Sequence, residues 1–127
     1  MAVQHVATHA EFQSLLDTTM YVVADFYADW CGPCKQIAPL YEQFAKQFAV
    51  PGYLAFAKVN VDNNRQTASQ YGISAMPTFM FFKNGKQVGV NGNAMIRGAD
   101  VQSLRGAVDK LGNLAKAKQA AGVKVGE

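Results

Sequence analysis

Several residue types that often carry chemistry are scarce in this 127-residue sequence, which has two cysteines, two histidines and one tryptophan. Two cysteines form at most one disulfide, so a small scaffold held by several disulfides is excluded. A structural zinc site needs about four ligands, and His5 and His9 lie far along the chain from Cys31 and Cys34. Zinc binding is therefore the weaker explanation for the cysteines, and we predict no metal site.

Long apolar runs are missing as well. No stretch approaches the roughly 18 uninterrupted apolar residues that indicate a membrane-spanning helix. Residues 1–13, MAVQHVATHAEFQ, lack the charged start and apolar segment of a secretory signal. We therefore expect a soluble cytoplasmic protein that does not bind membranes. Thiols in that compartment are kept reduced, so a cysteine pair there is more often catalytic or metal-binding than a permanent brace.

Charge of one sign is not concentrated in the body of the chain. The formal net charge is +3, but residues 112–127 hold three lysines and one glutamate, which leaves +1 for residues 1–111. The basic stripe with interleaved aromatics that is typical of nucleic-acid binding is absent. We expect no nucleic-acid partner, and we expect a monomer.

Half of the residues are hydrophobic, which is enough for one domain with an ordinary core. Strand and helix periodicity alternate, which predicts an α/β fold: a central mixed sheet of four to five strands with helices on both faces. This domain should cover residues 1–111. After Gly112 the pattern fades into Ala, Lys and Gly, so residues 112–127 are expected to form a basic tail that is frayed or disordered. The expected strands are 3–6, 21–28, 54–61, 78–82 and one from about 86, and the expected helices begin near residues 8, 31, 63 and 100.

The two cysteines stand in ADWCGPCK, residues 28–35. Three explanations are open: half of a zinc site, a structural disulfide, or a pair that cycles between dithiol and disulfide. A brace across two intervening residues closes a ring too small to constrain the unfolded chain much. Cys31 follows a buried strand and begins a helix, so its sulfur faces free N–H groups that stabilise a thiolate. The pattern favours a redox pair in which Cys31 is the nucleophile and Cys34 the resolving thiol.

Gly32 and Pro33 indicate the direction of that redox chemistry. Neither has a polar side chain and proline lacks an N–H, so neither adds a group that stabilises the thiolates. A less stabilised dithiol makes the disulfide relatively favourable, and the pair should therefore be reducing. A histidine between the cysteines would favour an oxidant instead. We predict a reductase rather than an oxidase or isomerase.

The segments YVVADFYA, WCGPCK, LAFAKVNVD and SAMPTFMFFKNGK resemble the thioredoxin family, in matching order and spacing over residues 3–111. The resemblance, to the cytosolic eukaryotic type, implies a thioredoxin fold and a general protein-disulfide reductase acting by dithiol–disulfide exchange. It implies no bound cofactor, and NADPH only indirectly, through a thioredoxin reductase. The implied targets are disulfide-containing proteins such as peroxiredoxins, methionine sulfoxide reductase and ribonucleotide reductase. A non-catalytic docking module with this fold is the alternative from another class.

The resemblance also implies roles for residues around the cysteines. Asp25, the one acid in the apolar run 21–28, corresponds to the family acid that takes the proton of the resolving cysteine. Lys58 corresponds to a lysine that modulates this acid. Pro77 corresponds to a cis proline facing the cysteines, and Met76 to a residue that offers backbone hydrogen bonds to an extended substrate. The implied substrate-binding surface comprises Trp30, Gly32, Pro33, Met76, Pro77, Gly98 and Ala99.

One region departs from the family pattern, because more residues lie between Gly85 and Gly98 than compact members have. Asn84-Gly85 is a strong hairpin signal, and Asn91-Gly92 offers a second turn. We expect a lengthened hairpin or a bulged edge strand, whose register decides where Gly98 and Ala99 lie. Tyr27 also stands where many members have a second tryptophan.

Overall fold

A single mixed β-sheet organises the computed structural model, which describes residues 2–127. Its strands are β1 (Val3–His5), β2 (Tyr21–Tyr27), β3 (Leu54–Asn60), β4 (Thr78–Lys83), β5 (Lys86–Val88) and β6 (Met95–Arg97). The order is β1-β3-β2-β4-β5, with β6 also paired to β4. Strands β1, β3 and β2 are parallel to one another, and β4 runs antiparallel to β2, β5 and β6. The predicted mixed sheet is confirmed, with six strands instead of four to five.

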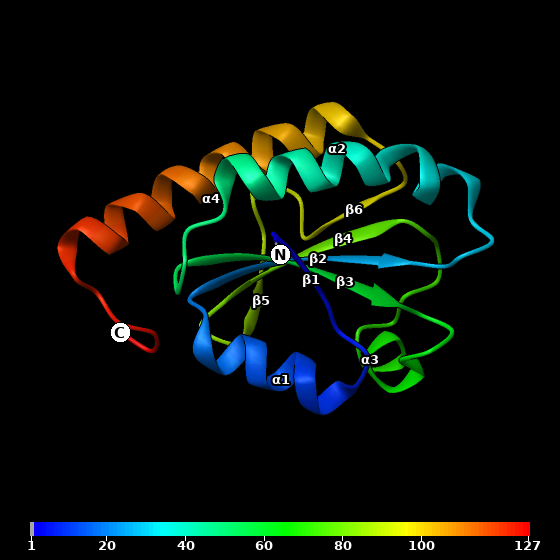
Figure 1. The fold of residues 1–127 in the computed structure, drawn as a ribbon, viewed down its shortest axis with the longest axis horizontal. Coiled ribbons are helices and arrows are strands. Elements are labelled where there is room, and N and C mark those ends of the chain that lie inside the picture. The colour runs from blue at the N-terminus through cyan, green and yellow to red at the C-terminus, as the bar shows by residue number, and fades with distance from the viewer. Residues whose placement is uncertain (1) are drawn as a thin grey trace.

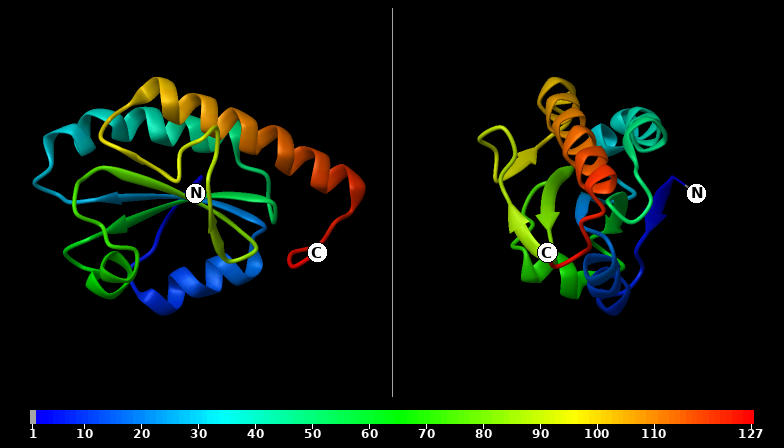
Figure 2. Two further views of the ribbon diagram at one scale, coloured as in Figure 1. Left: turned by 180° about the vertical axis from the view of Figure 1, so that it is seen from behind. Right: turned by 90° about the vertical axis from the view of Figure 1, so that its left-hand side faces the viewer.

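Four helices cover the two faces of the sheet. They are α1 (His9–Thr18), α2 (Gly32–Phe48), α3 (Arg65–Gln70) and α4 (Val101–Ala121). Figure 1 shows α2 and α4 side by side on one face, with α1 and α3 on the other, and the reverse view in Figure 2 shows the same layers. Within the described part of the chain, no helix combines the length and the apolar character needed to cross a membrane.

Side chains on β2 alternate between two cores, as expected for a strand covered on both faces. Val23 lies in the core beneath α2 and α4, whereas Val22, Ala24 and Phe26 lie in the core that faces α1. By this alternation Asp25 points toward α2. The strand periodicity therefore places the one buried acid of β2 on the same face as the helix that begins beside Cys31.

The extra residues between Gly85 and Gly98 form an excursion from the edge strand. On β4, Phe81 pairs with Val88 of β5, and the preceding residue, Met80, pairs with Met95 of β6. Residues 89–94 leave the sheet between these two pairs and turn back at Asn91-Gly92, where both φ angles are positive, 52° and 83°. The second turn and the bulged edge strand are thus confirmed. Because β6 pairs again with β4, Gly98 and Ala99, which follow β6, lie beside the start of β4 despite the extra residues.

The prediction of a frayed or disordered tail from Gly112 is wrong. Helix α4 continues through Gly112 to Ala121 and ends at Gly122, whose φ of 68° is the left-handed cap that glycine favours. Ala115 is fully buried, and a Cβ at Gly112 would lie 3.0 Å from the Phe48 ring of α2. Small residues permit this close approach of α2 and α4. The alanines and lysines after Gly112, which suggested a frayed or disordered tail, are also strong helix formers.

The residues after α4 contact the domain as well. Val123 and Val125 pack against the core beneath α2 and α4. The Gly126 N–H donates to the Asn84 side-chain oxygen at 2.9 Å, at the turn between β4 and β5. Residues 112–127 therefore belong to the folded unit.

Two alanines of α4 provide a test of this correction. Ala115→Asp places a carboxylate in the core and should lower the free energy of unfolding by roughly 3 kcal/mol. Ala117→Asp changes an exposed position of the same helix and should change it by less than about 0.5 kcal/mol. Urea unfolding of both variants measures the difference. Equally small changes in unfolding free energy would contradict the correction and favour a disordered tail.

Candidate active site

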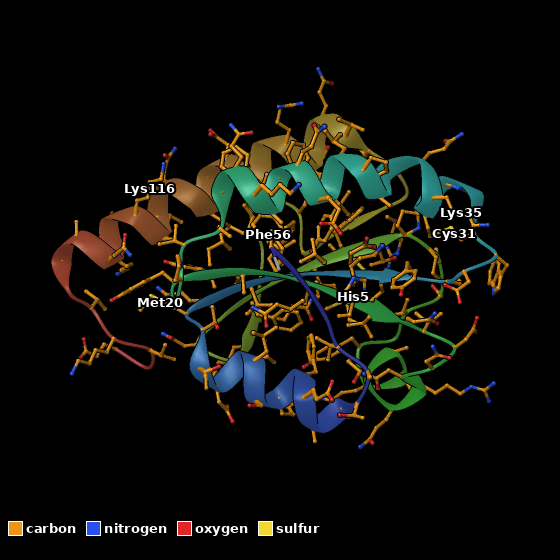
Figure 3. All side chains as sticks on the ribbon, in the orientation of Figure 1. His5, Met20, Cys31, Lys35, Phe56 and Lys116 are labelled. Carbon is orange, nitrogen blue, oxygen red and sulfur yellow. A yellow bond between two sulfur atoms is a disulfide. The ribbon has the colours of Figure 1, made fainter. Side chains whose placement is uncertain are left out.

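Cys31 lies where β2 has ended and α2 begins (Figure 3), and Cys34 lies in the first turn of α2. They form a disulfide with their Cα atoms 5.3 Å apart. Cys31 is the N-cap of α2, and its sulfur accepts the backbone N–H of Cys34 at 3.2 Å. Pro33 occupies the first turn, where a missing N–H leaves no intrahelical bond unmade. The helix start therefore directs an N–H group at the Cys31 sulfur, which favours a thiolate there when the disulfide is reduced.

The loop before β4 faces this sulfur. The Met76-Pro77 peptide bond is cis, and the Met76 carbonyl oxygen lies 3.5 Å from the Cys31 sulfur. Gly98, which follows β6, donates its N–H to the Pro77 carbonyl at 2.7 Å. The structure thus brings Cys31, Met76, Pro77 and Gly98 together despite the insertion, and Ala99 follows Gly98 at an exposed position.

An exposed apolar surface adjoins the cysteines. Trp30 is 69% exposed, and Gly32 and Pro33 are exposed beside it. The indole N–H of Trp30 donates to a carboxylate oxygen of Asp62 at 3.0 Å, which fixes one end of the ring while its faces stay open. Sequence reasoning did not single out Asp62. Its position after β3 was the available signal, because the carboxyl ends of the parallel strands β2 and β3 meet at one edge of the sheet.

Asp25 is buried on the face of β2 that points toward α2. Its exposed fraction is 1%, and neither carboxylate oxygen has a hydrogen-bond partner among residues 2–127. Burial raises the pKa of Asp25 from 3.8 to about 7, against a smaller opposing effect of the Lys58 charge. A carboxyl group with this pKa can exchange a proton near neutral pH.

Lys58 lies next to Asp25, in register with it on β3. Its ammonium group is 4.4 Å from the centre of the Tyr27 ring. Tyr27, Cys34, Lys35 and Lys58 contribute to the lining of a cavity of about 180 Å³ that opens to solvent. The structure therefore places Lys58 and Cys34 on one small cavity beside the buried acid, and adds Tyr27 to the residues that the sequence had identified.

Metal-ligating residues are not gathered at this site. The part of the chain that the structure describes contains no group of three or more His, Cys, Asp or Glu side chains able to hold a metal ion. The Nδ1 atom of His9 lies 2.8 Å from the Thr67 hydroxyl, at the α1–α3 contact.

A disulfide at a helix N-terminus, opposite a cis proline and above a buried acid, defines a thiol-disulfide oxidoreductase of the thioredoxin fold. The thioredoxin family model matches residues 3–109, and the chain belongs to this family. A thioredoxin of Neurospora crassa is 66% identical over 119 residues, 94% of each chain. A thioredoxin-like protein of Fusarium culmorum is 60% identical over 93% of this chain and 98% of its own.

Solved structures agree with this assignment. Plasmodium falciparum thioredoxin superposes with a TM-score of 0.75 at 36% identity, covering 84% of this chain and 97% of its own. The protein is a protein-disulfide reductase of the thioredoxin family that acts by dithiol–disulfide exchange through Cys31 and Cys34. Members of the family need no bound cofactor.

Proposed function

We propose that the cysteines divide the exchange between them, with Cys31 as the nucleophile and Cys34 as the resolving thiol. The Cys31 thiolate attacks one sulfur of a target disulfide, whose S–S bond breaks as a mixed disulfide forms and a target thiolate leaves. Asp25 takes the proton of the Cys34 thiol, and the Cys34 thiolate attacks the Cys31 sulfur. The second target thiolate leaves, and the Cys31–Cys34 disulfide remains. Two electrons have then passed from the pair to the target.

The placement of the Cys31 sulfur is the observation that carries this proposal. It accepts an N–H of the helix start and faces the Met76 carbonyl, so it lies between the thiolate-stabilising helix and the loop that receives substrate. Cys34 lines a cavity together with Lys58, whose register partner on β2 is Asp25. Lys58 modulates Asp25 in this scheme, because its charge favours the carboxylate.

An extended segment of the target would bind beside Cys31. Backbone groups of Met76 can hydrogen-bond such a segment in the manner of strand addition. The residues proposed to contact it are Trp30, Gly32, Pro33, Met76, Pro77, Gly98 and Ala99. None of them is charged, and Trp30, Gly32, Pro33 and Ala99 are exposed, which suits a reductase that accepts many targets.

The oxidised protein must be reduced again for a second turnover. We propose a thioredoxin reductase as the electron donor, with NADPH as its source, and a monomer that works in cytoplasmic electron transport. The proposed targets are peroxiredoxins, methionine sulfoxide reductase and ribonucleotide reductase. These partners rest on the family relationship.

A redox titration tests the proposed direction of electron flow. Trp30 is the only tryptophan and is adjacent to Cys31, so its fluorescence should report the state of the disulfide. In dithiothreitol redox buffers at pH 7 we expect a two-electron transition at or below about −250 mV, since about −270 mV is established for thioredoxins. A midpoint near about −180 mV would instead indicate an oxidase or isomerase.

A further inference from the structure

The position of the Lys58 ammonium group is unexpected for a lysine beside a buried carboxylate. Asp25 and Lys58 are register partners on the parallel strands β2 and β3, so their side chains leave the same face of the sheet. Opposite charges this close ordinarily form a salt bridge. Here neither oxygen of Asp25 accepts a hydrogen bond from Lys58, and the ammonium lies over the Tyr27 ring at 4.4 Å.

Tyr27 is placed to compete with Asp25 for this cation. It follows Asp25 by two residues on β2 and therefore projects from the same face. An ammonium over an aromatic face is attracted by the negative face of the ring quadrupole, and more strongly as water is removed from the contact. Lys58 and Tyr27 are both half-buried, whereas Asp25 is 1% exposed. The ring offers the ammonium a favourable contact that keeps it partly hydrated, and a salt bridge to Asp25 would require its full desolvation.

We propose that Tyr27 is a positioning residue: its ring holds the Lys58 ammonium away from Asp25, so that the carboxyl stays free of a salt bridge and available to accept a proton. A direct ion pair would favour the carboxylate and weaken it as a base. At its observed position Lys58 acts on Asp25 only through space. The catalytic meaning of this inference rests on the proposed role of Asp25.

Other groups around Asp25 do not supply the same control. The titratable and charged side chains near Asp25 and Lys58 are Tyr27 on β2, Asp29 just beyond it, His5 on β1, and Cys34, Lys35 and Tyr41 on α2. From β4, Asp25 faces the uncharged Phe79. Burial raises the pKa of Tyr41, which stays neutral and lies 2.8 Å from the Ala57 carbonyl as a donor. Among residues 2–127, Lys58 is the cation whose charge lowers the pKa of Asp25, against the larger effect of burial.

The test is a titration of Asp25 in the oxidised protein, read at its own carboxyl carbon by NMR, where the cysteines do not titrate. Tyr27→Leu removes the ring and keeps an apolar side chain. We expect the pKa of Asp25 to fall by about one to three units as Lys58 reaches the carboxylate. Tyr27→Phe and Tyr27→Trp keep an aromatic face and should change it by less than about half a unit.

A second background isolates the lysine. In Lys58→Met, Tyr27→Leu should no longer lower the pKa of Asp25. The inference is overturned by an unchanged or raised pKa in Tyr27→Leu, by an equal fall in Tyr27→Phe, or by a fall that persists without Lys58. Circular dichroism of each variant checks that the fold is retained.

The same variants separate this inference from the proposed function. The carboxyl titration needs no substrate, so it reports the Tyr27–Lys58 contact whatever Asp25 does in catalysis. The pH profile of mixed-disulfide resolution should move to lower pH with the carboxyl titration. If the titration moves and the profile does not, the positioning by Tyr27 stands and the role of Asp25 is wrong.

Discussion

Replacement of Cys34 by serine is expected to turn the protein from a catalyst into a covalent trap. Cys31 would still attack a target disulfide, because its thiolate depends on the helix start and on a backbone N–H that serine retains. The mixed disulfide would then persist, since no second thiol lies beside it. Turnover of a disulfide substrate such as insulin should fall by roughly 1,000-fold or more, as when one member of a catalytic unit is removed.

The trapped complex provides a direct measurement. A non-reducing gel and mass spectrometry should show one target joined through Cys31, and dithiothreitol should release it. Cys31→Ser is the matched control, because Cys34 lies one turn further into α2 and should trap little. Equal trapping by both single variants would contradict the assignment of nucleophile and resolving thiol. Target binding that survives loss of both cysteines would favour the docking-module alternative.

Substitution of Asp25 by asparagine should stabilise the oxidised protein at high pH. The folded-state pKa of Asp25 is about 7 against 3.8 for the free group, so the folded protein holds this proton more tightly than the unfolded chain. The protein is therefore stabilised below about pH 4, loses that stability as the pH rises to about 7, and loses no more above it. The 3.2-unit difference between about 7 and 3.8 corresponds to about 4 kcal/mol.

Asparagine cannot ionise, so it removes this pH dependence while keeping a similar shape. The gain in unfolding free energy of Asp25→Asn over the natural protein should rise by about 4 kcal/mol between pH 4 and pH 8. Urea unfolding at both pH values measures it, and the difference cancels any constant cost of the buried amide. Asp17→Asn, an exposed change on α1, should show no such rise. A gain independent of pH would mean that Asp25 is not the proton-binding group.

Residues close together in the sequence encode most of the architecture. Thr8 at the start of α1 accepts the Glu11 N–H at 3.1 Å, and Asp100 at the start of α4 accepts that of Ser103 at 3.1 Å. These caps and the apolar runs between them were visible as patterns, because a helix start depends on neighbours three residues apart. The last part of α4 was not predicted, because its buried residues Gly112 and Ala115 are small and give no local apolar pattern. Their burial depends on the packing of α4 against Phe48 of α2, which is distant in the sequence.

The sequence alone indicated a redox role for a cysteine pair at a strand-to-helix junction, because the start of a helix favours a thiolate without distant partners. The roles of the lone acid in the preceding strand and of the Met-Pro loop before a later strand came from the resemblance to the thioredoxin family. Only the tertiary structure decided that Asp62 fixes Trp30 and that Lys58 lies over Tyr27 rather than against Asp25. Those contacts join different strands and loops, and they depend on strand register and on competing side-chain interactions that no single segment encodes.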